Sequence, residues 1–149
     1  MKKKFQILFL FLFVGCSLCM AKKISVVYPR VEMQENPLGI DLKNPHFSWQ
    51  LASDVKDVKQ IGYEIQLAAD LRDLKRGDNL IWKSGLVQSD KMQIEYEGLP
   101  MQSCEEYYWR VRVQTNHGMS SWSAIQRFST GMLHAEDWHA EWIGENAMS

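Results

Sequence analysis

Cysteine is scarce in this chain. The 149 residues include three cysteines, and two of them, Cys16 and Cys19, fall in a hydrophobic N-terminal segment. Only Cys104 belongs to the body of the sequence, and a single thiol cannot form an internal disulfide. The fold therefore has to be held by a hydrophobic core, and a cysteine-rich metal site is excluded. We interpret Cys104 as an incidental turn residue, although an exposed thiol could pair between chains in an oxidising compartment.

Metal-ligand clusters and nucleophile motifs are also missing. The four histidines lie in separate segments, without the His-x-x-x-His or cysteine spacing of a zinc site; they are His46, His117, His134 and His139. The sequence has neither a glycine-rich phosphate loop nor a Gly-x-Ser-x-Gly turn. We expect no catalytic, cofactor-binding or metal-binding residue in this chain, and no cofactor.

Concentrated positive charge is absent. The chain has 17 Lys and Arg against 18 Asp and Glu. Removing residues 1–21 takes away three lysines and no acids, so the remainder carries 14 minus 18, or −4. The densest basic stretch, Arg72 to Arg76, also contains Asp73. A nucleic-acid surface needs a clustered basic patch, so nucleic acid is excluded as an expected partner.

Long hydrophobic runs are confined to the N-terminus. Three lysines at positions 2–4 precede an apolar run from Phe5 to Val14 that only Gln6 interrupts. This run is well short of the ~18–20 residues that a membrane span needs. Residues 1–21 are therefore predicted to be a secretory signal peptide, and the protein is expected to be exported, periplasmic or extracellular.

Two cleavage sites fit this segment. Cys19-Met20-Ala21 has the small-x-small pattern and would release a chain that begins at Lys22. Val14-Gly15-Cys16 resembles a lipoprotein box, and cleavage there would make Cys16 a lipidated N-terminus that anchors the protein to a membrane. Phe13 stands where leucine is usual in that box, which favours simple secretion. A membrane partner is expected only if Cys16 is lipidated.

Short alternating segments fill the rest of the chain. Residues 107–113 place Tyr107, Trp109, Val111 and Val113 on one face, as in a half-buried antiparallel strand. Further strands are predicted at 24–28, 46–51, 63–69, 80–83, 92–96 and 124–129, and one helical turn at 70–74. Tyr107, just after the apolar-proline turn at 99–101, has the layout of a tyrosine corner. This pattern predicts an all-β antiparallel seven-stranded β-sandwich of the immunoglobulin or fibronectin type III kind.

The sandwich is expected to occupy residues 22–131 and to end at Gly131. Residues 132–149 are interpreted as a connector and the first strand of a further domain. Trp138, Trp142 and Ile143 belong to this strand, at 137–144, which has no following partner to bury its apolar side. We therefore expect the chain to be a truncated part of a longer protein or a fragmentary gene product.

Taken in order, the motifs of the chain resemble the N-terminal region of bacterial α-L-rhamnosidases, glycoside hydrolase family 78. The matching segments are 36–41, 45–51, 60–65, 80–85, 107–113, 121–123 and 137–144, nearly all of the chain after the signal segment. The resemblance implies a fibronectin type III-like accessory domain. It also implies a parent enzyme whose acidic residues, in an (α/α)₆ barrel further downstream, hydrolyse terminal α-L-rhamnosyl bonds with inversion. None of that barrel is in this chain, so no catalytic residue is carried over.

The acids of this chain do not form a glycosidase pair. Inverting hydrolysis needs two carboxyl groups ~6.5–9.5 Å apart, whereas an extended chain points the adjacent Glu105 and Glu106 to opposite sides. The expected role is a non-catalytic accessory domain whose partners are the downstream domains of the glycosidase.

An alternative function is a stand-alone exported module that binds a glycan or a protein. Sugars stack on exposed aromatic rings, so the tryptophans are the residues to test. Trp49 and Trp109 are predicted to be core residues. Trp82 and Trp122 are the candidates for carbohydrate or interdomain contact, and their exposure side by side would favour this alternative.

Overall fold

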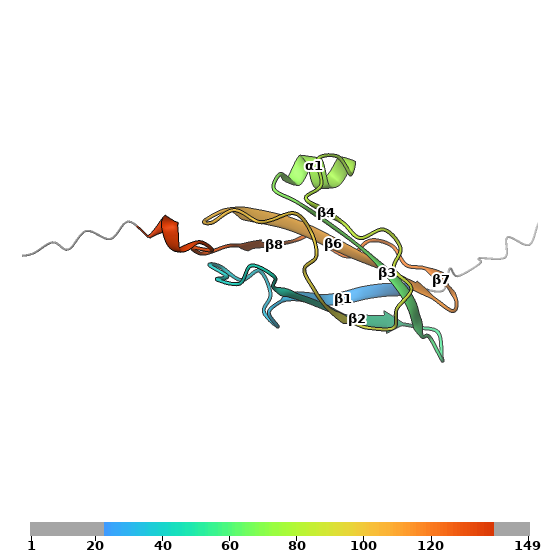
Figure 1. Ribbon diagram of the computed structural model, residues 1–149. Coiled ribbons are helices and arrows are strands. Elements are labelled where there is room, and N and C mark those ends of the chain that lie inside the picture. Colours follow the sequence, from blue (N-terminus) through green and yellow to red (C-terminus); the bar gives the residue numbers. More distant parts are fainter. Residues whose placement is uncertain (1–22, 139–149) are drawn as a thin grey trace, which may run out of the picture.

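Two antiparallel sheets pack face to face in the computed structural model, which describes residues 23–138 (Figure 1). The first has the strand order β1 (Ile24–Val31), β2 (His46–Ser53) and β5 (Gln93–Glu95). The second has the order β4 (Trp82–Lys83), β3 (Gln60–Ala68), β6 (Glu106–Thr115) and β7 (Gly118–Met119), and β8 (Gln126–Ser129) also pairs with β6. This is the sandwich that the alternation predicts.

The core lies between the sheets and is centred on aromatic rings. Along β6 every second side chain is buried, including Tyr107 and Trp109. Phe47 of β2 is fully buried, and the ring of Trp109 meets it edge-on at 4.7 Å. Phe128 of β8 packs on Phe47 in the same way, with ring centroids 5.8 Å apart. Edge-to-face contacts of this kind add to the stability that burial itself gives.

The predicted tyrosine corner is present before β6. Tyr107 is 3% exposed, and its hydroxyl oxygen accepts the backbone N–H of Gln102 at 2.7 Å. Burial raises the pKa of the Tyr107 phenol, so the ring stays neutral. Cys104, in the turn between them, is exposed and has a free thiol.

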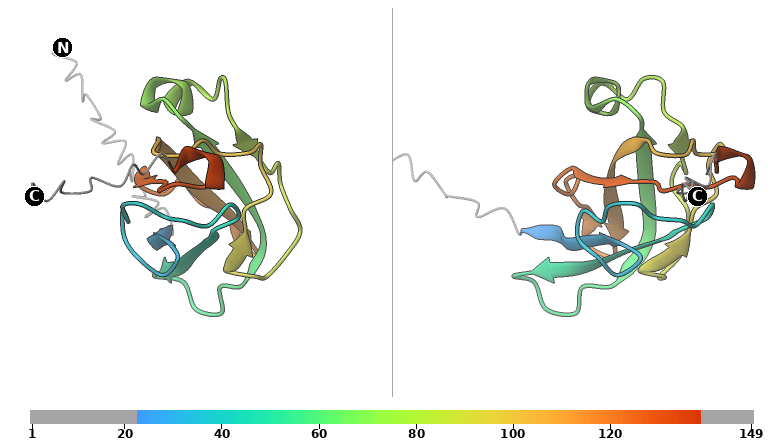
Figure 2. Two further views of the ribbon diagram at one scale, coloured as in Figure 1. Left: turned by 60° about the vertical axis from the view of Figure 1, so that its left-hand side comes forward. Right: turned by 90° about the vertical axis from the view of Figure 1, so that its left-hand side faces the viewer.

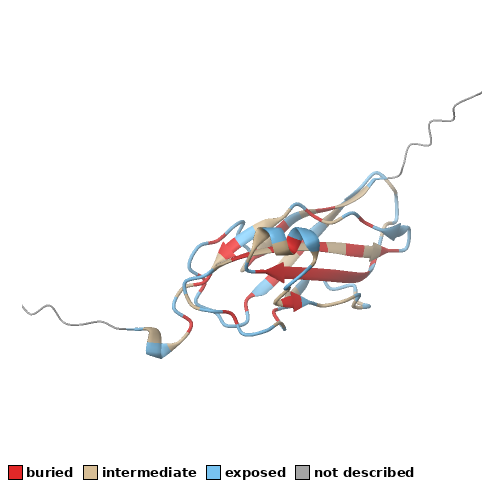
Figure 3. Cartoon of the chain, turned by 90° about the horizontal axis from the view of Figure 1, so that it is seen from above, coloured by how far each residue is buried: buried red, intermediate tan, exposed pale blue. Residues whose placement is uncertain are grey.

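The predicted helical turn is a short helix, α1 (Leu71–Arg76), on the outer side of the second sheet. Asp70 caps its first turn by accepting the backbone N–H of Arg72 at 2.6 Å, and Gly77 ends it with a left-handed φ of 76°. Leu74 is fully buried beneath it. β3 is buried along nearly its whole length, because α1 and polar side chains on the outer face of the second sheet cover it (Figure 3).

Packing continues past Gly131, where the sequence places the end of the sandwich. Leu133 is 7% exposed and belongs to the core, and its backbone N–H donates to Ser103 Oγ at 2.8 Å. A 3₁₀ turn, η1 (Ala135–Asp137), follows. It includes the first residue of the strand predicted at 137–144, and the rest of that strand from 139 onward lies outside the described residues. The predicted signal peptide and Cys16 also lie outside them.

The described chain begins and ends at opposite ends of the sandwich (Figure 1), and the right-hand view of Figure 2 looks from the end where it stops. Lys23 lies beside the β2–β3 loop, where its carbonyl accepts the N–H of Asp54. At the other end, three segments meet: loop 32–45, loop 97–105 and residues 130–138. Neither helical segment within residues 23–138 has the length and hydropathy needed to cross a membrane.

Candidate functional site

Trp122 lies over the outer face of the second sheet, between two arginines of β6. The guanidinium carbons of Arg110 and Arg112 are 4.5 and 4.6 Å from the centroid of its ring. Arg110 donates two hydrogen bonds to Gln66 Oε1, and Arg112 donates two to Glu64 Oε2, at 2.6–2.8 Å for the latter. We call these five residues the Trp122 ladder.

Two serines hold Trp122 in this position. The backbone N–H groups of Ser120 and Ser123 each donate at 2.8 Å to the carbonyls of Val113 and Val111 on β6. Their hydroxyls accept the N–H groups of the same two valines, at 3.0 and 3.1 Å. The segment that joins β7 to β8 therefore stays hydrogen-bonded to the edge of β6. The sequence singles out Trp122 but not its arginines, because their alternation with buried residues is equally typical of a solvated strand face.

The charges of the Trp122 ladder are largely satisfied within it. Glu64 is 7% exposed and is paired with Arg112. Burial lowers the pKa of Arg110, repulsion from Arg112 lowers it further, and Glu64 opposes both effects. The guanidinium groups of Arg110 and Arg112 lie over the indole ring and cover part of it. The ladder is thus built like a packed outer layer of the sheet.

Trp82 is a core residue, which argues against its prediction as a candidate for carbohydrate or interdomain contact. It is 7% exposed, and its ring meets those of Phe47 and Tyr96 edge-on, at 5.4 and 5.0 Å. The reason is the strand register: Trp82 pairs with Leu67 of β3, and paired residues share a face of the sheet. β4 has two residues, too few for alternation to reveal the inward side.

Trp82 and Trp122 consequently lie on opposite faces of the second sheet and do not form a joint platform. Trp49 and Trp109, at 2% and 0% exposed, are core residues as predicted. A carbohydrate or interdomain contact at Trp122 remains a prediction.

Among residues 23–138, most of the acidic side chains that form an ion pair do so with an arginine. Glu106 pairs with Arg127 at 3.6 Å and accepts the hydroxyl of Tyr108, while Asp73 pairs with Arg76 at 2.6 Å. In the part of the chain that the structure describes, no group of three or more His, Cys, Asp or Glu side chains is placed to hold a metal ion.

Exposed apolar side chains occur on all three segments that meet at the end of the sandwich where the described chain stops. They include the following, whose exposed fractions run from 42% to 77%: Leu38, Leu42, Leu99, Met132 and Trp138. A hollow of about 180 Å³ lies among the same segments, lined by residues that include Lys43, Pro100 and His134. We call this region the C-terminal pole.

Comparison with known proteins places the chain in a family. Residues 26–134 match the family described as Rha78A-like, N-terminal immunoglobulin domain. The chain belongs to this family. The predicted resemblance to the N-terminal region of α-L-rhamnosidases is thereby confirmed.

Curated relatives of the chain carry the family's enzyme name. An α-L-rhamnosidase of Streptomyces avermitilis is 35% identical over 126 residues, which are 83% of this chain. Another, of Formosa agariphila, is 32% identical over 111 residues, or 74% of this chain. In both cases the match spans 12% of the relative's own length. The family domain is therefore a small part of those proteins.

Solved structures agree. The chain superposes on the α-L-rhamnosidase of Dictyoglomus thermophilum with a TM-score of 0.78 at 34% identity, covering 83% of this chain and 14% of that one. The Streptomyces avermitilis α-L-rhamnosidase complexed with L-rhamnose gives 0.75 at 36% identity, covering 83% and 12%. A fibronectin type III domain of the human KIAA0970 protein gives 0.50 at 13% identity, covering 85% and 82%, and so shows the fold alone. The relatives with related sequences hold this sandwich inside larger rhamnosidases, which implies partner domains.

Proposed function

We propose that this chain is a non-catalytic accessory domain of an α-L-rhamnosidase-like glycoside hydrolase and that it packs against downstream domains. The parent enzyme would hydrolyse terminal α-L-rhamnosyl residues of glycans or glycosides. The C-terminal pole is the observation that carries this proposal. It carries exposed apolar side chains at the end of the sandwich where the chain continues beyond Trp138.

The pole has the chemistry of a surface that another domain covers. Complete burial of a large apolar side chain gives about 1.5–3 kcal/mol, and Leu38, Leu99 and Trp138 are each more than 60% exposed. Single exposed apolar residues are ordinary, whereas several of them on adjoining segments at one end of the molecule favour an interaction site. Hydrogen bonding and packing of residues 130–133 hold the exit of the chain firmly beside this surface.

The carboxylates favour a non-catalytic role. Glu64, the most buried acid among residues 23–138, is paired with Arg112 within the Trp122 ladder. A general acid has to face the substrate, whereas Glu64 is buried and its carboxylate is held by the guanidinium of Arg112 at 2.6 Å.

Hydrolysis of a chromogenic α-L-rhamnoside by the purified chain is the first test. We expect no release of the chromophore above that of the buffer. Hydrolysis that follows the chain through purification would overturn the non-catalytic role.

Reading the coding DNA past the codon for Ser149 is the second test. A reading frame for a further β-sandwich and an acid-rich helical barrel supports the accessory role. A genuine stop with no such frame would contradict it and would favour a self-contained binding module.

If a longer protein is found, packing of a neighbouring domain against the C-terminal pole can be tested in it directly. Leu99→Ser should lower the midpoint of thermal unfolding of the longer protein more than that of the 149-residue chain, because only the longer protein buries Leu99. Leu86→Ser, at a side chain that is 45% exposed on the β4–β5 connection, is the matched control and should affect both alike. Equal effects of the Leu99 change in both proteins would refute packing at the pole.

Export is part of the same proposal. We expect cleavage after Ala21 and recovery of the protein in a periplasmic or extracellular fraction. Labelling with a palmitate analogue, lost in Cys16→Ala, would show instead that the chain is lipid-anchored.

A further inference from the structure

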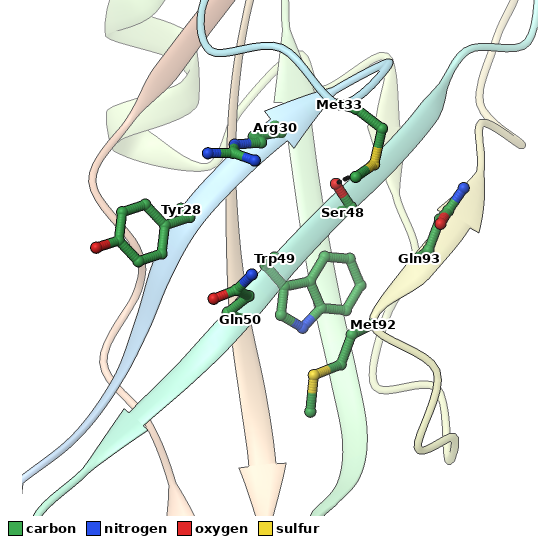
Figure 4. Close-up of a pocket in the computed structure, with 8 residues that line it drawn as sticks. All are labelled: Tyr28, Arg30, Met33, Ser48, Trp49, Gln50, Met92 and Gln93. Atoms are coloured by element: carbon green, nitrogen blue, oxygen red, sulfur yellow. Dashed lines mark hydrogen bonds between the residues drawn. The ribbon is translucent and has the colours of Figure 1, made fainter.

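A hollow of about 310 Å³ lies on the outer face of the first sheet, away from the C-terminal pole (Figure 4). Its floor is a polar row that crosses all three strands: Arg30 of β1 is paired in register with Ser48 of β2, which is paired with Gln93 of β5. Gln50 stands two residues from Ser48 on the same strand and lines the hollow too. The volume is at the lower end of the range of small-molecule sites.

Tyr28 stands beside this row in a strained conformation. Its φ is 50°, in the left-handed region that non-glycine residues seldom adopt, and it sits at an irregularity in β1 between Val27 and Arg30. Such bulges re-aim a side chain. The ring is 57% exposed, and the guanidinium carbon of Arg30 lies 5.8 Å from its centroid. An aromatic ring is thus held outward, at a conformational cost, without being used in the core.

Two thioethers complete the surroundings. Met33 and Met92 are 63% and 37% exposed and line the same hollow. Figure 4 shows the ring of Tyr28, the polar row and the side chains of Met33 and Met92 around the same hollow. Adaptable apolar side chains beside amide and hydroxyl groups suit a ligand that has both an apolar edge and many hydroxyls.

The charge of Arg30 is already met on one side, because its Nη2 is 3.5 Å from Glu35 Oε1. Its Nε is buried and has no hydrogen-bond partner among residues 23–138, so it remains a donor in need of an acceptor. A ligand hydroxyl can accept from the exposed part of the Arg30 side chain, which is 35% exposed, and from Nε only after that side chain moves; in neither case does it bring a further charge. These features favour a neutral ligand over an anion.

We propose that this hollow is a binding subsite for a neutral saccharide unit, whose apolar face stacks on Tyr28 and whose hydroxyls bond to the Arg30–Ser48–Gln93 row. It lies on a sheet face, while the packing proposed above uses the C-terminal pole. Either proposal can therefore fail without the other.

Nuclear magnetic resonance titration of the ¹⁵N-labelled chain tests the subsite. The probes are methyl α-L-rhamnopyranoside, methyl β-D-glucopyranoside and, as an anion, D-galacturonate, each up to about 50 mM, since single sugar units bind weakly. We expect saturable shifts with at least one neutral sugar, confined to β1, β2, β5 and the adjoining Met33 and Met92. No saturable shift with either neutral sugar, shifts that map to the Trp122 ladder or the pole, or tighter binding of galacturonate would overturn the proposal.

Tyr28→Gly separates loss of the ring from loss of the fold. Glycine adopts the φ of 50° without strain, so the variant should unfold at the same temperature as the parent or higher. Its affinity for the sugar should nevertheless fall at least about tenfold. Trp138→Gly, which removes another exposed aromatic ring, is the control and should keep the affinity. Unchanged affinity in Tyr28→Gly would overturn the site even if a sugar binds.

Discussion

Replacing Trp82 with alanine distinguishes a core tryptophan from a surface one. The side chain is 7% exposed and meets the rings of Phe47 and Tyr96 edge-on. Truncation of a buried tryptophan or phenylalanine to alanine costs about 3–5 kcal/mol, part of it for the cavity that remains. Since β4 is a two-residue edge strand that can partly collapse, we expect the lower part of that range, about 3–4 kcal/mol.

Trp122→Ala is the matched control because it removes the same side chain from the other face of the sheet. It loses two cation–π contacts, with Arg110 and Arg112, each worth about 0.5–1 kcal/mol where partly exposed. The expected loss is therefore about 1–2 kcal/mol, roughly half that of the Trp82 variant.

Urea unfolding of the full chain, followed by far-ultraviolet circular dichroism, measures both losses. Thermal unfolding measures the same losses as a change in the midpoint temperature, because 1 kcal/mol corresponds to about 4 °C for a domain of this size. Trp82→Ala should therefore melt about 12–16 °C below the parent, and Trp122→Ala about 4–8 °C below it. A Trp82 variant that is as stable as the Trp122 variant, or more stable, would refute the placement of Trp82 in the core.

Three further changes test other parts of the structure. Gly98→Ala should lower the free energy of unfolding by about 1–3 kcal/mol in urea, because its new Cβ would lie 2.6 Å from Tyr96 Cζ; an unchanged midpoint would contradict that packing. The side-chain and backbone hydrogen bonds from Arg72 lower the pKa of Asp70 from 3.8 to about 2, so the carboxylate stabilises the fold above pH ~4 and this contribution is lost as the pH falls towards ~2. The unfolding temperature of Asp70→Asn should therefore approach that of the parent over this interval, and a constant difference would contradict the lowered pKa. Ending the chain after Gly131 should cost about 2–3 kcal/mol through loss of buried Leu133, whereas ending it after Trp138 should cost little; equal stability of the two would support the boundary predicted at Gly131.

Residues with a long, regular alternation could be predicted well from the sequence. β6 alternates over ten residues, so its buried face, its tyrosine corner and the sandwich class follow from pattern alone. The ends of α1 could also be predicted, because the Asp70 side chain caps its first turn and Gly77 adopts the left-handed φ that ends it. In both cases the deciding interactions lie close together in the sequence.

Trp82 and the hollow on the first sheet could not be predicted, because both depend on register between distant strands. The inward side of β4 is set by the pairing of Trp82 with Leu67, fifteen positions away. The row formed by Arg30, Ser48 and Gln93 exists only once three strands are aligned. The strain at Tyr28 is likewise invisible in the sequence, since an ordinary strand residue and a bulge residue look the same there.

The three surfaces of the sandwich differ in how far their groups satisfy one another, and this difference indicates where contacts are to be sought. In the Trp122 ladder, carboxylate, amide, guanidinium and indole groups are matched to each other, so a ligand would have to break these contacts before making its own. At the C-terminal pole, apolar side chains such as Leu99 are left in water, which a neighbouring domain would remedy. On the first sheet, Tyr28 is held outward under strain and Arg30 Nε is without an acceptor among the described residues. A ligand binds most favourably to groups whose interactions are not already satisfied within the protein. We therefore expect binding at the C-terminal pole and on the first sheet rather than at the Trp122 ladder.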